Sequence, residues 1–147
     1  MPHVEKSVLL NYSAQQMFDL VEHIERYPEF LPWCGGTTVK AREATHTVAT
    51  IMINYHGVKH NFTTHNTNQT PRLIEMRLVD GPFKFLNGKW HFISLKESAC
   101  KIVFDLQYEF STPILGVVLG PVFHHIAHTF VEAFIRRAKE IYGPHKG

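Results

Sequence analysis

The stretch CKIVFDLQYEF, residues 100–110, alternates almost strictly between apolar and polar side chains. Its even-numbered positions are all apolar, whereas the odd-numbered ones are charged or polar apart from Val103. Successive side chains of a strand point to opposite faces of a sheet, so this pattern predicts a half-buried antiparallel strand. The face predicted to point inward carries Cys100, Ile102, Phe104, Leu106, Tyr108 and Phe110.

The segment after this strand is predicted to be a long helix. Thr112 can serve as its N-cap and Pro113 as its first residue. Gly143-Pro144 predicts the C-terminal end of the helix. Gly120-Pro121 is expected to kink or restart the helix. Its apolar residues recur at helical spacing: Phe123, Ile126, Ala127, Phe130, Phe134, Ala138 and Ile141. We expect this stripe to meet the inward face of the preceding strand across a core or a cavity.

The chain before residue 100 also consists mainly of strands. From about residue 37 onward, tight turns at Gly57 and Thr70-Pro71-Arg72 separate segments that alternate with period two. One such segment is predicted to point Val58, His60, Phe62 and Thr64 inward. The others lie at 49–55, 74–78 and 90–94.

The N-terminal part is predicted to hold an edge strand and a short helix. Residues 3–10 alternate, and Ser13 with Gln16 forms the pattern of a capping box before a helix at 14–24. Consecutive antiparallel strands with helices at the ends of the chain indicate an α+β fold. We therefore expect one domain, residues 1–147, in which a curved antiparallel sheet wraps around the long C-terminal helix.

Two apolar segments do not fit regular strands or helices. YPEFLPWC, residues 27–34, holds two prolines and three aromatic residues, so it is predicted to be a compact turn that forms a lid or wall, with Pro28 starting a helical turn near 27–31. DGPFKFLNGKW, residues 80–90, is predicted to be a loop. Its phenylalanines either cap the core or form a gate, with Gly88 as a hinge. On the gate hypothesis, Phe83 and Trp33 flank the mouth of a cavity.

Composition excludes several classes of function. A net charge of +2 in 147 residues is too small to indicate a DNA-binding protein. The two cysteines lie far apart, the N-terminus lacks the apolar region of a signal peptide, and no run of 18 apolar residues exists. The expected location is therefore the cytoplasm.

The chain shows no set of catalytic or metal-ligating residues. His124, His128 and Glu132 follow one another at one-turn spacing, as zinc ligands can, but they diverge from the apolar stripe. We therefore expect a solvated helix face and no metal. Nucleophile-elbow and phosphate-loop motifs are absent from the sequence, so we expect neither an enzyme nor a cofactor. Cys34 and Cys100 are expected to be buried and inert.

At several runs the chain resembles the coenzyme Q-binding START-domain family, within the START/polyketide-cyclase-like superfamily. The resemblance covers nearly the whole chain. The runs are 13–21 (SAQQMFDLV), 27–34, 80–84 (DGPFK), 108–110 (YEF), 120–123 (GPVF), 133–134 (AF) and 137–140 (RAKE). It implies the helix-grip fold with an internal cavity, and ubiquinone or a related polyprenyl lipid as the ligand. Bacterial members are also described as ribosome-association toxins that block the joining of the ribosomal subunits.

The resulting hypothesis is a binding protein that supports respiratory quinone function as a carrier or chaperone. It implies transient contact with a membrane surface, peripheral to the inner membrane. The first alternative is a translation inhibitor that binds the large ribosomal subunit, and the second is a small-molecule cyclase. The residues predicted to line the cavity are Trp33, Phe62, Met76, Phe83, Phe85, Trp90, Phe104, Tyr108, Phe123, Phe130 and Phe134.

Overall fold

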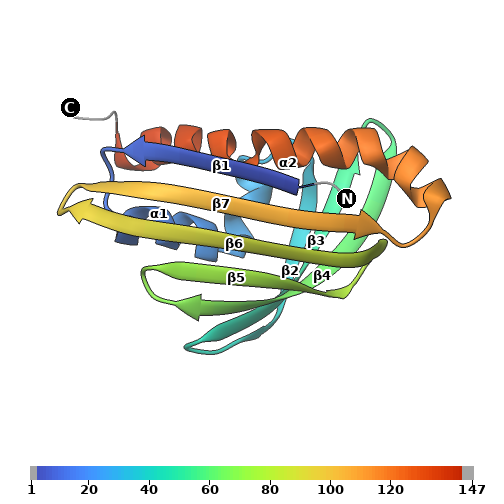
Figure 1. Ribbon diagram of the computed structural model, residues 1–147, viewed down its shortest axis with the longest axis horizontal. Coiled ribbons are helices and arrows are strands. Elements are labelled where there is room, and N and C mark those ends of the chain that lie inside the picture. Colours follow the sequence, from blue (N-terminus) through green and yellow to red (C-terminus); the bar gives the residue numbers. More distant parts are fainter. Residues whose placement is uncertain (1–2, 144–147) are drawn as a thin grey trace.

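A computed structural model describes residues 3–143, which form a seven-stranded antiparallel sheet and a long C-terminal helix (Figure 1). The order of the strands across the sheet is β1-β7-β6-β5-β4-β3-β2. All six pairings are antiparallel. The strands are β1 (His3–Leu10), β2 (Cys34–Arg42), β3 (His46–Tyr55), β4 (Val58–Gln69), β5 (Leu73–Asp80), β6 (Phe83–Lys96) and β7 (Ala99–Phe110).

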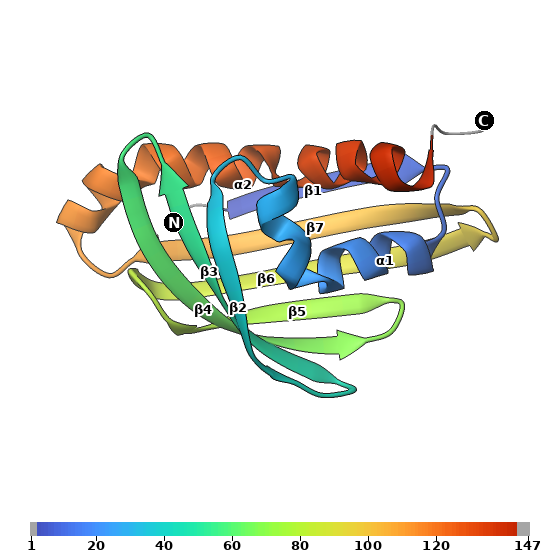
Figure 2. The same ribbon diagram turned by 180° about the vertical axis from the view of Figure 1, so that it is seen from behind.

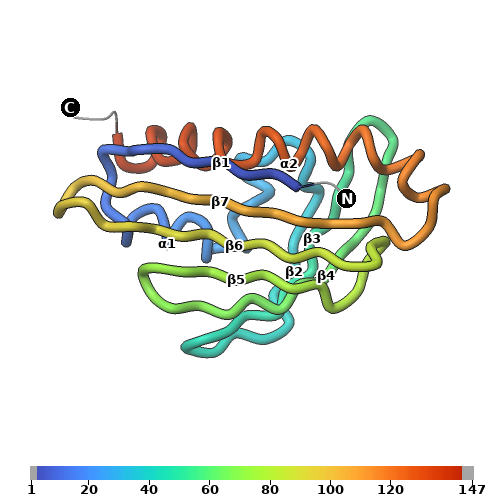
Figure 3. The backbone as a smooth tube through the Cα atoms, in the orientation of Figure 1, coloured from blue at the N-terminus to red at the C-terminus, as the bar shows by residue number. Residues whose placement is uncertain are grey.

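Three helical segments cover one side of this sheet. They are α1 (Ala14–Glu22), the 3₁₀ helix η1 (Ile24–Glu29) and α2 (Pro113–Tyr142). The backbone tube shows how strongly the sheet curves, and α2 runs along its concave side next to β1 and β7 (Figure 3). Seen from behind, α1 and η1 lie beside α2 and against the long strands (Figure 2). The predicted α+β helix-grip fold is confirmed.

The local signals in the sequence are confirmed where they are strongest. Ser13 and Gln16 form both hydrogen bonds of the capping box at the start of α1, and Thr112 caps α2 with Pro113 in its first turn. On β7 the predicted inward face is buried throughout, apart from a half-buried Phe110. The helix stripe meets that face, since the rings of Phe104 and Phe130 lie 5.6 Å apart, but its last predicted member, Ile141, is exposed.

The predicted loop at 80–90 is wrong. β5 ends at Asp80 and β6 begins at Phe83, so only Gly81 and Pro82 separate the two strands. A bulge in the pairing of β6 with β7 lies between Phe83 and Phe85, and both Phe83 and Leu86 are buried. An irregular register of this kind disrupts the alternation of apolar and polar residues by which a strand is recognised in a sequence.

Gly88 lies inside β6 and is not a hinge. A Cβ atom at this position would collide with Cε of Met76 on the neighbouring strand and would touch Leu106. The glycine therefore leaves room for the flexible end of Met76, and it lies within the regular pairing of β6 with β5 and β7.

Two predicted helix boundaries and the predicted restart of the long helix at Gly120-Pro121 also need correction. Pro28 lies within η1 and does not begin it, and α1 ends at Glu22, two residues early. Pro121 removes one backbone donor, but α2 continues through it as one helix of 30 residues. Gly143 ends the helix at φ 85°, whereas Pro144 lies outside the described residues.

By length and composition, α2 is also apolar enough to cross a membrane. Core helices of soluble proteins pass the same test, and Phe123, Phe134 and Ala138 of this helix are buried against the rest of the molecule. The result is weak evidence for a membrane span.

Candidate functional site

A cavity of about 50 Å³ lies between the concave face of the sheet and α2. Six of its lining residues were predicted from the sequence: Trp33, Phe62, Met76, Phe104, Phe123 and Phe130. Nine more complete the wall: Ile24, Tyr27, Ile51, Thr64, Asn66, Leu86, Leu106, Ile126 and Ala127. The wall is almost entirely apolar, so this space favours hydrocarbon over water.

Five predicted cavity residues do not line this space. Trp90 and Tyr108 lie on the concave side of the sheet and Phe134 lies on the side of α2 that faces it, but there the rings of the two layers pack directly against one another. The ring of Phe134 lies 5.3 Å from that of Trp90, and the ring of Phe123 lies 4.6 Å from that of Tyr108. The sequence pattern predicted which side chains point toward the space between the sheet and α2, but it did not predict where α2 is far enough from the sheet to leave a void.

The other two residues, Phe83 and Phe85, belong to the bulged start of β6. Phe83 is 5% exposed, and its ring packs 4.9 Å from that of Phe123 and 5.1 Å from that of Phe110. Phe85 is half-buried and lies opposite Glu109 in the register with β7. Phe83 therefore occupies a core position, which does not favour the gate hypothesis for this residue.

The polar part of the cavity wall comes from β4. Thr64 and Asn66 are both buried, and the hydroxyl of Thr64 donates a hydrogen bond of 2.9 Å to Oδ1 of Asn66. The alternation that placed Phe62 and Thr64 inward continues to Asn66, and this signal could have identified it. This bond uses the hydroxyl hydrogen of Thr64 and the amide oxygen of Asn66, whereas the amide NH₂ of Asn66 is a further donor in the cavity wall.

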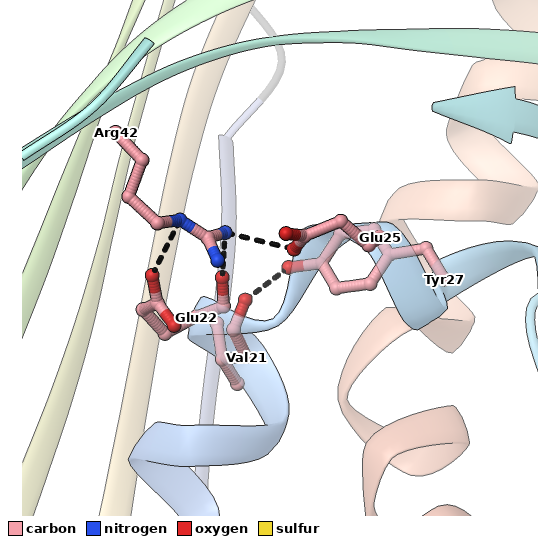
Figure 4. Close-up of polar contacts among 5 residues, drawn as sticks. All are labelled: Val21, Glu22, Glu25, Tyr27 and Arg42. Carbon is pink, nitrogen blue, oxygen red and sulfur yellow. Dashed lines mark hydrogen bonds and ion pairs between the residues drawn. The ribbon is translucent and has the colours of Figure 1, made fainter. Parts of the chain in front are cut away.

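One wall of the cavity is η1, which two sets of contacts hold in place (Figure 4). The phenol of Tyr27 donates a hydrogen bond of 2.5 Å to the carbonyl of Val21, at the end of α1. Arg42 of β2 lies 3.4 Å from Glu22 and 2.8 Å from Glu25. Burial alone would raise the pKa of Glu25, but its backbone hydrogen bond and Arg42 lower that pKa overall. These contacts hold η1 against α1 and β2, and Tyr27 and Trp33 of the apolar segment 27–34 line the cavity, which agrees with one of its two predicted roles, that of a wall.

The buried phenol of Tyr27 predicts a dependence of stability on alkaline pH. Burial, with smaller contributions from Cys34 and the nearby glutamates, raises its pKa above the ordinary value of 10.0. An unfolded chain ionises this phenol near pH 10, whereas the folded chain keeps its proton. Below about pH 10 the phenol is protonated in both states, and the free energy of unfolding does not depend on it. As the pH rises above about 10, ionisation in the unfolded chain lowers the free energy of unfolding by up to about 1.4 kcal/mol per pH unit.

We therefore expect Tyr27→Phe to lower the free energy of unfolding by about 1 kcal/mol near neutral pH, because the hydrogen bond to Val21 is lost. Between about pH 10 and pH 11, the variant should lose stability less steeply than the wild-type protein. Urea unfolding at a series of pH values measures both effects. Parallel stability curves for the two proteins would contradict the assignment to Tyr27.

A second, larger space opens on the surface beside Trp33. This outer hollow has a volume of about 480 Å³ and lies between the segment joining η1 to β2, the end of β3 and the middle of α2. In Figure 2 that joining segment arches beside α2. Its walls are Pro32, Trp33, Tyr55, His125, His128, Thr129, Glu132, Ala133 and Arg136. Trp33 lines both the outer hollow and the inner cavity.

The histidines of α2 lie on its exposed face, as predicted. Nδ1 of His128 donates a hydrogen bond of 2.9 Å to the carbonyl of His124, and both side chains are exposed. Among residues 3–143, the one group that brings three metal-ligand atoms together is His3, Glu5 and Asp105, on the outer face of β1 and β7, and it does not include the histidines of α2. Exposed groups of this kind are common without a metal, so the expectation of no metal stays a prediction.

Both cysteines are free and buried. Burial raises the pKa of the Cys34 thiol, and it raises that of the Cys100 thiol to about 11. Both thiols are therefore protonated at neutral pH, which disfavours a nucleophilic role.

This architecture, a curved antiparallel sheet around a long helix with an apolar cavity between them, defines the START-like class. The chain matches the family described as "Polyketide cyclase / dehydrase and lipid transport" over residues 10–135, and it belongs to that family. The resemblance seen in the sequence is thereby confirmed.

Relatives by sequence fall into two groups. Ribosome association toxin RatA of Vibrio cholerae is 43% identical over 143 residues, covering 97% of this chain and 99% of its own length. The Escherichia coli protein of the same name is 39% identical over 142 residues, covering 97% and 90%. The mitochondrial coenzyme Q-binding protein COQ10 of Drosophila melanogaster is more distant, at 26% identity over 95% of this chain and 59% of its own.

Solved structures share the fold at low identity. A START superfamily protein from Mycobacterium smegmatis superimposes with a TM-score of 0.79 at 19% identity, covering 95% of this chain and 98% of that one. The Zhui aromatase/cyclase from Streptomyces also gives 0.79, at 15% identity, covering 94% and 93%. None of the three relatives by sequence named above carries an enzyme name, whereas the fold is shared with cyclases.

Proposed function

We propose that this protein is a non-catalytic binding protein whose inner cavity takes the apolar tail of a polyprenyl lipid, with ubiquinone or a related quinone as the ligand. The observation that carries this proposal is the apolar space between the sheet and α2. Each CH₂ group that leaves water gains about 0.8 kcal/mol, so a carrier must offer a space as dry as the bilayer. The similarity to the coenzyme Q-binding protein of Drosophila gives independent support.

The size of the cavity adds a physical requirement to this proposal. Pockets for small molecules usually have volumes of about 300–1,000 Å³, whereas the inner cavity has about 50 Å³. A quinone therefore requires that the walls separate as it enters. The free protein should be closed, and ligand binding should open it.

Mass spectrometry of the intact protein, purified under native conditions, tests for the ligand. We expect a lipid of quinone mass that leaves the protein when solvent unfolds it. Titration of delipidated protein with short-tailed ubiquinone should then show saturable binding of one molecule per chain. Absence of both a co-purified lipid and saturable binding would contradict the proposal.

Exchange of a lipid with a bilayer needs a surface that touches the membrane. The first turns of α2 expose Ile114 and Val117, at 75% and 78%, with Val118 beside them at 54%. We propose that this uncharged end of α2 makes the transient membrane contact. Flotation with liposomes measures it: Val117→Asp should lower the bound fraction, and equal flotation of the variant and the wild-type protein would contradict the contact.

The cyclase alternative receives little support from the cavity. Such an enzyme needs polar groups that converge on a substrate, but Thr64 and Asn66 hydrogen-bond to one another, and the other lining residues are apolar apart from the phenol of Tyr27 and the indole of Trp33. The phenol of Tyr27 is directed to the carbonyl of Val21.

Ribosome association is the second candidate, and sequence similarity favours it more strongly than it favours quinone binding. The relatives at 39–43% identity over nearly the whole chain carry that name. Three basic residues lie within four positions of the sequence, Arg136, Arg137 and Lys139, but the basic surface that they form is small. Arg137 is only 16% exposed and pairs with Glu29 at 2.5 Å, which leaves Arg136 and Lys139 on the surface.

Sedimentation with purified ribosomal subunits tests the second candidate. We expect the protein to co-sediment with the large subunit, to lower the yield of joined ribosomes, and so to act in the cytoplasm. Weaker binding at high salt would indicate phosphate contacts. Unchanged joining at saturating protein would contradict ribosome association and would leave the quinone proposal standing.

A further inference from the structure

Trp33 separates two spaces of very different size and polarity. Its side chain is 4% exposed and lies 6.1 Å from the ring of Phe130, which also lines the inner cavity. On its other side lies the outer hollow, which is roughly ten times larger than the inner cavity. No other residue among those described lines both spaces. A molecule that occupies both must therefore displace this indole.

The outer hollow supplies a charged hydrogen-bond donor, which the lining of the inner cavity lacks. Arg136 contributes an exposed guanidinium, which can only donate hydrogen bonds. His125 stacks on Tyr55 with the ring centroids 5.7 Å apart and the planes nearly parallel, at 5°, and both rings line the hollow, where each offers a flat aromatic surface. Donors beside a flat aromatic surface suit a planar ring whose oxygens accept hydrogen bonds.

The two spaces together match a molecule with a planar polar ring and an apolar tail. On the basis of the proposed function, we propose that a quinone ring rests in the outer hollow against Arg136, His125 and Tyr55, while its tail moves Trp33 aside and enters the inner cavity. The polar pair inside the cavity is a poorer site for the ring. The hydroxyl of Thr64 already bonds to Asn66, and neither side chain carries a charge, whereas Arg136 in the outer hollow does.

Two probes with matched tails separate the site of the ring from that of the tail. Ubiquinone with two isoprene units carries both parts, whereas geraniol carries a tail of the same length without the ring. We expect the double variant His125→Ala/Arg136→Gln to bind the quinone about 5- to 50-fold more weakly, because it loses up to two ring contacts. Geraniol binding should not change. Lys139→Gln, exposed on the same helix but outside the hollow, is the matched control.

Tryptophan fluorescence reports the movement of the partition. The chain has two tryptophans, and Trp90 is fully buried without lining the cavity. Quinone should quench mainly Trp33, so most of the quenching should disappear in Trp33→Phe. Trp33→Ala removes the partition and should strengthen geraniol binding. Thermal melting of each variant verifies that it is folded.

Several outcomes would overturn the inference while quinone binding itself stands. Equal weakening of quinone and geraniol in the double variant would indicate a general structural effect. A loss confined to the quinone in Asn66→Leu, with no effect of the double variant, would place the ring inside the cavity. Failure of both probes to bind the wild-type protein would refute the proposed function and this inference together.

Discussion

Phe83→Asp is expected to lower the free energy of unfolding by at least about 4 kcal/mol and to leave much of the protein unfolded at 37 °C. The side chain is 5% exposed and packs among the rings of Phe62, Tyr108, Phe110 and Phe123. Removing a buried phenylalanine ring costs about 3–5 kcal/mol, and the carboxylate adds the cost of burying an unpaired charge. Urea unfolding followed by circular dichroism measures the loss.

Val79→Asp is the matched control, because it introduces the same charge at a position that is 59% exposed near the end of β5. Its effect should stay within about 0.5 kcal/mol. The gate hypothesis from the sequence predicts the opposite for Phe83→Asp, namely a stable fold with weakened quinone binding. That result would show that Phe83 acts at the mouth of the cavity and not in the core.

Ala127→Leu is expected to weaken quinone binding at least about 10-fold, which corresponds to about 1.4 kcal/mol. Ala127 is 1% exposed on α2 and lines the inner cavity, so a larger side chain fills the space that the tail would enter. Overpacking a filled core lowers the free energy of unfolding by about 1–3 kcal/mol, and here the loss should not exceed this range because the added carbons enter a void. Quinone titration together with thermal melting measures both quantities.

Ala41→Leu makes the same change at an exposed position of β2 and should leave quinone affinity unchanged. Ribosome association, if it uses the outer surface, should also be unchanged in Ala127→Leu. Full quinone affinity in a folded Ala127→Leu protein would show that the tail lies elsewhere.

Local sequence patterns were sufficient wherever a backbone period or a cap decides the structure. The alternation at 100–110 identified β7 and its buried face, and Ser13 with Gln16 identified the start of α1. The stripe from Phe123 to Ala138 identified the buried face of α2. These features depend on neighbours a few residues apart along the chain, so the sequence contains them directly.

The sequence by itself therefore determined the fold class, the family and six of the cavity residues. Only the tertiary structure decided that residues 83–90 form a strand, because a bulge and a glycine packed against Met76 interrupt the period that marks one. It also decided which inward residues border a void, since this depends on where α2 stands away from the sheet. Trp33 shows the difference most clearly: its apolar surroundings were predictable, but its place between two spaces arises from three elements that meet only in the folded chain.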